Sequence, residues 1–417
     1  MDYKKLLQLI LDIAEEMLVA GAEVSRVEDS IQRMCAAYGF IEERTNAFII
    51  TSNIQVAAES PDGEVITQIR QVVRSDINYD RLDYLNDLSR KICSKRYSLE
   101  EIREMYDAVM ARPGNPLPFY LLGRFCAAGG FTVFFGGSIA DGVFAGLAGI
   151  LVALFLRFMD RIDNNVLAKT FLASILSGFL AIGLSFFGIH ADKIMIGCIM
   201  LLIPGIALTN SIRDMLIGDI ASGLLRFFNS LLIAVVIACG FAIPILFVGK
   251  SFMLLHSGGS YYGEYEWLVQ LASALIGSYG FAVFFNMKGR QVAYAAVSGC
   301  ATWGVYLAAV HFGMEGVFLP TLIASIFAGI VSDRLAVINR APATIFLTAS
   351  AITLIPGSSL YYAMSNLVSR NMENFEFYAQ RAVSTALAIA LGFFFVALFN
   401  KYLALARKSG RKRERGE

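Results

Sequence analysis

Ten apolar runs follow one another between residues 116 and 405, and they constrain the fold more than any other feature of the chain. A bilayer core about 30 Å thick needs roughly 20 apolar residues per helix, and the runs are near that length. Lipid offers no hydrogen bonds to the backbone, so runs of this kind form helices. The sequence therefore predicts ten transmembrane helices, at residues 117–137, 142–159, 167–188, 194–212, 225–248, 267–287, 291–311, 316–332, 343–364 and 382–403.

Charged side chains divide the chain into two parts. Residues 1–112 hold 34 of the 69 Lys, Arg, Asp and Glu residues, 14 of them basic and 20 acidic. We therefore predict an α+β domain at 1–115, a five-helix unit at 116–250, a second at 265–405 and a basic tail at 406–417. The net charge of +1 indicates no nucleic-acid partner.

The first 115 residues, called the head from here on, combine helical and strand patterns. Apolar residues recur at helical spacing in the first 34 residues and predict two amphipathic helices. Residues 44–59 are rich in β-branched side chains and precede the turn sequence Ser60–Gly63 and a run at 64–73, which predicts a β-hairpin. Two polar helices follow, and Ser98 with Glu101 forms a capping-box pattern.

The second predicted helix begins with a dense charged cluster, Glu23, Arg26, Glu28 and Asp29. It is either a solvated first turn or a binding or docking surface. The head contains no histidine, phosphate loop or paired nucleophile and base, so no catalytic residue is predicted. The six cysteines of the chain are scattered singly, and we predict neither a metal site nor a cofactor.

The basic residues near the ends of the apolar runs predict the orientation in the membrane. With the head inside, seventeen Lys and Arg residues lie on the cytoplasmic side and four lie opposite: Lys193, Lys250, Arg370 and Arg381. The prediction is a multi-pass membrane protein with both termini cytoplasmic. Its basic tail is expected to contact anionic lipid.

Short sequences recur at a nearly constant offset and indicate a duplicated unit. GFTVFF at 130–135 matches GFAVFF at 280–285, and LIPG at 202–205 matches LIPG at 354–357. The offsets are 150 and 152 residues. A unit of five helices is odd, so the second copy enters the membrane upside down. The predicted fold is thus an α-helical membrane protein of two inverted five-helix repeats behind a small α+β cytoplasmic domain, an architecture typical of secondary transporters.

The two LIPG motifs interrupt the fourth and ninth predicted helices at matching positions. Proline removes a backbone donor and glycine weakens the turn, which leaves polar backbone groups that a ligand can satisfy. Hydroxyl, amide and phenol groups follow both motifs and suit a small zwitterion. We predict a substrate site formed by Pro204, Gly205, Thr209, Asn210, Ser211, Pro356, Gly357, Ser358, Ser359 and Tyr362.

Ionisable residues close to membrane depth are candidates for proton coupling or gating. Asp214 and Asp219 follow the first LIPG motif, and an ion pair between Asp214 and Arg213 is an equal alternative. Asp333 and Arg334 form a predicted cytoplasmic turn pair.

These residues resemble the threonine/serine exporter family of bacterial inner-membrane proteins. The resemblance rests on AGAEVSRVE at 20–28 and on LIPG at 202–205 with the continuation TNSIRD at 209–214 and Gly218-Asp219. It implies proton-driven export of threonine and serine by a head fused to ten helices, and it covers nearly the whole chain. Some relatives resemble carriers of small dicarboxylates such as succinate.

The working hypothesis is an alternating-access antiporter for small hydroxy amino acids, with protons as the coupled ion. Three alternatives stay open: an exporter of dicarboxylates, a passive channel, and a sensor or enzyme that acts through the head. The sequence leaves a homo-oligomer open as well.

Overall fold

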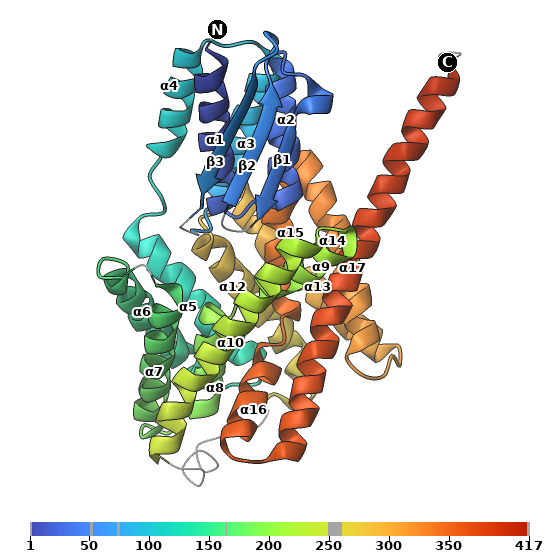
Figure 1. The fold of residues 1–417 in the computed structure, drawn as a ribbon. Helices are drawn as coiled ribbons and strands as arrows, with labels where there is room; N and C mark the ends of the chain where they lie inside the picture. Colours follow the sequence, from blue (N-terminus) through green and yellow to red (C-terminus); the bar gives the residue numbers. More distant parts are fainter. Residues whose placement is uncertain (1, 51–52, 73–75, 164, 249–260, 415–417) are drawn as a thin grey trace.

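The computed structural model describes residues 2–50, 53–72, 76–163, 165–248 and 261–414 (Figure 1). Side chains at positions 206, 209, 213 and 217 and from 404 onward are not described. The head lies at one end of a long helical region, and the described C-terminus lies at the same end.

Four helices form the body of the head, as the periodicity predicts. They are α1 (Tyr3–Val19), α2 (Val24–Ala37), α3 (Tyr79–Ser94) and α4 (Leu99–Met110). Helix α1 is apolar on most of its surface, and Leu7, Ile13 and Met17 are fully buried. The capping box at the start of α4 is confirmed, because Ser98 and Glu101 each accept the other's backbone N–H.

A three-stranded antiparallel sheet packs against α1 and α2. Its strands are β1 (Asn46–Ile50), β2 (Asn53–Glu59) and β3 (Val65–Gln71), in the order β1-β2-β3. The β2–β3 hairpin is confirmed. The continuous strand predicted over residues 44–59 is wrong, since the chain reverses after Ile50 and β1 pairs back onto β2. A polar Thr-Ser-Asn sequence interrupts the apolar alternation there.

The helical region contains twelve labelled helices within the described residues. They are α5 (Leu117–Phe134), α6 (Ile139–Met159), α7 (Val166–Ser185), α8 (Ala191–Leu202), α9 (Gly205–Ile217), α10 (Ile220–Val248), α12 (Glu266–Phe284), α13 (Arg290–His311), α14 (Phe318–Asn339), α15 (Ala343–Ala351), α16 (Gly357–Val368) and α17 (Met372–Glu414).

Eight helices in the described part of the chain are long and apolar enough to cross a membrane. A ninth span results if α15 and α16 count as one helix bent by 50°. The predicted span 194–212 appears as the two shorter helices α8 and α9, so a count of ten stays a prediction. Helix α17 continues past its predicted end through the basic tail to Glu414 and rises beside the head (Figure 1).

Glycines bring α5 and α12 into close antiparallel contact at the centre of the helical region. A Cβ atom added to Gly280 would lie 2.3 Å from the backbone N of Ala127, and one on Gly130 would lie 2.7 Å from that of Gly277. Helices in lipid associate through such small residues, because close backbone approach maximises van der Waals contact. Phe131 and Phe281 pack edge to face beside this contact, with ring centroids 5.5 Å apart.

Equivalent contacts recur in the two halves of the helical region. A Cβ added to Gly240 in α10 would meet the side chain of Ser174 in α7 at 2.5 Å. One added to Gly392 in α17 would meet Ser325 in α14 at 2.0 Å. The paired positions differ by 151 and 152 residues, close to the offset of the LIPG motifs. The α7–α10 and α14–α17 pairs therefore pack through the same kind of small-residue contact.

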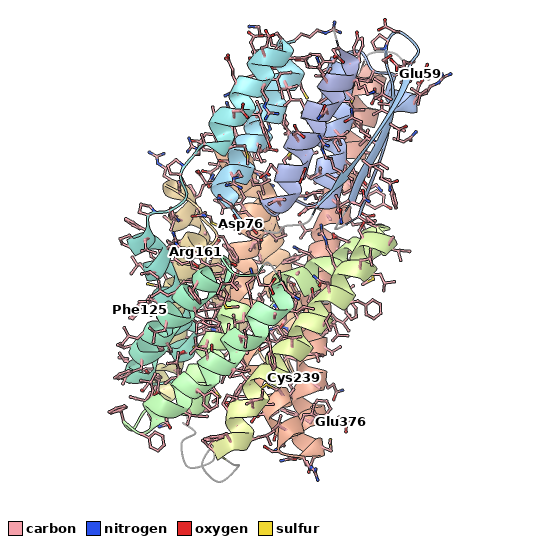
Figure 2. All side chains as sticks on the ribbon, turned by 60° about the vertical axis from the view of Figure 1, so that its left-hand side comes forward. Glu59, Asp76, Phe125, Arg161, Cys239 and Glu376 are labelled. Atoms are coloured by element: carbon pink, nitrogen blue, oxygen red, sulfur yellow. The ribbon has the colours of Figure 1, made fainter. Side chains whose placement is uncertain are left out.

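The head binds the helical region through buried polar contacts. Tyr79 is 2% exposed, and its hydroxyl donates to Thr348 Oγ1 in α15 at 2.7 Å. Its backbone N–H donates to the carbonyl of Phe285 at 2.9 Å. Lys288 Nζ donates to Asp80 Oδ2 at 2.9 Å. Figure 2 shows Asp76 at this junction, with Cys239 and Glu376 toward the other end of the helical region.

We expect Gly280→Ala to destabilise the protein, because its methyl group would overlap the α5 backbone, which cannot move aside freely. Overpacking of this kind costs about 1–3 kcal/mol. The measurement is the Tm of the purified protein in detergent. Gly183→Ala is the matched control, since a Cβ there meets no atom within 4 Å. Equal Tm values for the two variants would contradict the α5–α12 packing.

Candidate functional site

Both LIPG motifs break their helices with the same backbone geometry. Ile203 is extended (φ −66°, ψ 131°) between α8 and α9, and Pro204 follows at φ −83°, ψ 39°. Ile355 is extended (φ −61°, ψ 128°) after the short 3-10 helix η3 (Ile352–Leu354), and Pro356 follows at φ −77°, ψ 53°. The predicted interruptions are therefore present at both positions.

The two breaks lie against each other in the structure. A Cβ atom on Gly205 would lie 2.5 Å from Ile355 Cγ2, so the start of α9 packs on the second motif. A Cβ on Gly357 would lie 2.3 Å from Met200 Sδ in α8. Each glycine thus admits a neighbour that belongs to the other broken helix.

Polar groups of the second motif line a cavity of about 80 Å³. Pro356, Ser358 and Ser359 form one wall. Thr385 and Arg381 of α17 form another, and aromatic rings at α5 and α13 also line the cavity. The hydroxyl groups and the guanidinium offer hydrogen bonds beside apolar and aromatic walls, the usual composition of a small-molecule pocket.

Asn210 of the first motif lines a narrow void on the other side of Ile355. The void has a volume of about 10 Å³, and Thr344 and Thr348 of α15 also line it. A space of this size holds about one water molecule. Ile355 lines both this void and the 80 Å³ cavity, so the break in the second helix separates them.

Other predicted substrate-site residues are placed differently. Ser211 is buried, and its hydroxyl donates to the carbonyl of Leu208 at 2.6 Å within its own helix. Tyr362 lies a turn beyond the second motif, and its hydroxyl donates to Asp192 Oδ2 at 3.3 Å. Lys193 Nζ lies 3.5 Å from the same hydroxyl. The side chain of Thr209 lies outside the described residues.

The predicted coupling residues divide between two places. Asp214 is buried and forms an ion pair with Arg226 of α10, with 3.1 Å between Oδ2 and Nη1. The Arg213 side chain, the partner considered from the sequence, lies outside the described residues. Asp219 follows α9, and its backbone N–H donates to the carbonyl of Asp214 at 2.9 Å.

The predicted turn at Asp333 and Arg334 is wrong, because both residues lie within α14, which continues to Asn339. Asp333 Oδ2 accepts a hydrogen bond from Asn400 Nδ2 of α17 at 2.5 Å. Arg334 is exposed. The two neighbours therefore face different surroundings, and Asp333 is the one that lines a cavity, together with head residues Glu23 and Arg26.

Comparison with known proteins identifies the family of this chain. The family described as "Putative threonine/serine exporter" matches residues 8–248, more than half of the chain. The chain belongs to the threonine/serine exporter family. A second pattern of that family, "Threonine/Serine exporter, ThrE", matches residues 270–399.

Two relatives show how far the similarity extends. A Mycobacterium tuberculosis protein named "Probable threonine/serine exporter" is 23% identical over 87% of this chain and 70% of its own length. A Corynebacterium glutamicum "Threonine/serine exporter" is 24% identical over 93% of this chain and 80% of its own length. No solved structure matches the chain.

Sequence reasoning missed a buried acid in this family member. Asp141 is fully buried at the start of α6 and accepts hydrogen bonds from Ser138 and from the backbone N–H of His190 at 2.8 Å. The ring Nδ1 of His190 lies 3.0 Å from Asp141 Oδ2. The signal was present in the sequence as Ser138-x-x-Asp141, a capping-box spacing.

Glu28 in α2 is a titratable group at the junction between the head and the helical region. Burial raises the pKa of its carboxyl, and the nearby Asp219 carboxylate raises it further. A carboxyl with a raised pKa binds its proton more tightly in the folded state. The folded protein therefore loses stability as the pH rises through that pKa.

We expect Glu28→Gln to raise the Tm at about pH 8, where the cost of the charged carboxylate is fully present. Below the ordinary carboxyl pKa of 4.5 the substitution should change little, because the cost is absent there. Thermal unfolding at both pH values measures the effect. Glu43→Gln, at an exposed position, is the control. A Tm gain that is the same at both pH values would contradict this assignment.

Proposed function

We propose that this family member is a secondary exporter of serine and threonine, with the proton gradient as its energy source. The observation that carries the proposal is the pair of proline-broken helices that lie against each other beside a small polar cavity. Membership of the exporter family supports the substrate class. Broken helices present backbone dipoles to a ligand in the middle of a membrane, where a zwitterion needs them.

The proposed architecture has ten spans in two inverted five-helix repeats, with α8 and α9 together as the fourth span. The recurrence of equivalent glycine contacts at offsets of 151 and 152 residues supports the repeat. The head and the C-terminus lie at one end of the helical region, and the basic residues collect there. We assign that end to the cytoplasm and the chain to the bacterial inner membrane.

In the proposed cycle the two repeats rock around the broken helices. Pro356, Ser358 and Ser359 hold the amino acid in the 80 Å³ cavity, with backbone amides on its carboxylate and hydroxyl groups on its polar side chain. The Asp214–Arg226 ion pair is the coupling element, because a proton on Asp214 would remove its charge and weaken the pair. One inward proton at 100 mV supplies about 2.3 kcal/mol, enough for a roughly fortyfold gradient of a neutral zwitterion.

Transport by inside-out vesicles tests this function. With an acidic interior, we expect serine and threonine to accumulate and a protonophore to abolish the accumulation, because proton exit drives their entry. Alanine and succinate complete the substrate panel. A preference for succinate would show that the substrates are small dicarboxylates and not hydroxy amino acids. Equilibration of serine across the membrane without accumulation would indicate a channel.

A second experiment separates coupling from binding. We expect Asp214→Asn to lose gradient-driven accumulation but to keep serine exchange, because the proton-accepting group is removed while the substrate site stays intact. Asp219→Asn tests the second acid in the same way, and Asp163→Asn, in an exposed turn, is the control. A variant with both Asp214→Asn and Asp219→Asn serves as the final test. If it accumulates serine as well as the unaltered protein does, neither acid is the coupling residue.

A further inference from the structure

A charged cavity of about 170 Å³ lies where the head meets the helical region. Its lining comes from four separate parts of the chain. The head contributes Glu23 and Arg26, α14 contributes Asp333, α15 contributes Leu347, and α17 contributes Asn400. A cavity assembled from both the head and the membrane helices exists only while the head is docked.

Both carboxylates of this cavity are held in position by neighbours. Thr344 Oγ1 of α15 donates to Glu23 Oε1 at 3.0 Å, and Asn400 Nδ2 of α17 donates to Asp333 Oδ2. These hydrogen bonds fix the acids from opposite sides of the cavity. The cavity lining thus holds two positioned carboxyl groups, which favour a cationic group as ligand.

Arg26 supplies the positive charge. Its Nε atom is buried and has no hydrogen-bond partner among the residues that the structure describes. Leaving a buried charged donor unsatisfied is costly, so a ligand that accepts its hydrogen bond would gain that energy. Arg26 also lines a larger cavity of about 470 Å³ between α2 and α3. It therefore lies between that outer space and the 170 Å³ cavity.

The inner wall of the charged cavity leads toward the broken helices. Leu347 and Phe393 line both this cavity and the narrow void beside Asn210 and Ile355. A molecule in the charged cavity would thus be separated from the second LIPG motif by two apolar side chains and one water-sized space. Movement of α15 or α17 would connect the charged cavity with the second LIPG motif.

We propose that this cavity is an entry site for the zwitterionic backbone of an α-amino acid. The guanidinium of Arg26 binds the carboxylate with two parallel hydrogen bonds, and Glu23 with Asp333 binds the ammonium group. The site recognises the part common to all amino acids, while the hydroxyl groups at the LIPG break select the side chain. This inference rests on the proposed export function and gives the head a direct part in it.

Sidedness of the kinetics tests the entry site. In inside-out vesicles the head faces the medium, and Arg26→Gln should raise the KM for serine roughly tenfold or more, the effect of losing a charged hydrogen-bonded contact. In right-side-out vesicles, where serine enters from the opposite face, the KM should stay unchanged. The KM of Arg26→Lys should lie between those of the unaltered protein and Arg26→Gln, because lysine keeps the charge but loses the paired donors. Glu23→Gln should act in the same direction as Arg26→Gln.

Arg44→Gln is the control, since Arg44 is an exposed head residue paired with Glu59. The Tm of each variant in detergent shows whether the fold is intact. Equal KM changes from both faces, or none, would overturn the entry site while leaving export in place. Absence of amino-acid transport by the unaltered protein would overturn the proposed function and the entry site together.

Discussion

The contact between the two helix breaks is the constraint on which the rest of the structure depends. A proline inside a membrane helix leaves backbone groups that lipid cannot satisfy, so such a break must lie against protein or a polar cavity. Here Gly205 packs on Ile355, and Gly357 packs on Met200. A Cβ atom on either glycine would overlap the neighbouring side chain unless that side chain moved. The close glycine contact between α5 and α12 holds the two halves together around these breaks.

The head is attached to one of the broken helices. Tyr79 is buried and donates to Thr348, which lies four residues before the start of η3. Thr344, one turn earlier on α15, donates to Glu23 of the head. A shift of α15 during transport would therefore pull on both contacts. The same arrangement places Glu23 and Arg26 of the charged cluster in the lining of a cavity that α15 also borders.

More of the cavities and polar groups border the second broken helix than the first. The three spaces between Arg26 and Arg381 all border α15, η3 or α16. On the first helix, Ser211 satisfies its hydroxyl locally, and the buried pair of Asp192 and Lys193 lies beside Tyr362. The two motifs are alike in sequence and backbone conformation, but their surroundings differ.

The sequence alone determined the local features. Apolar run lengths gave the long helices, Pro204 and Pro356 gave the breaks, and Ser98 gave the α4 cap, because each depends on residues close in the chain. Tertiary structure decided which distant groups meet: Arg226 with Asp214, and Arg26 with the cavity of Asp333. Periodicity cannot reveal such pairs, since they arise from how helices and the head pack.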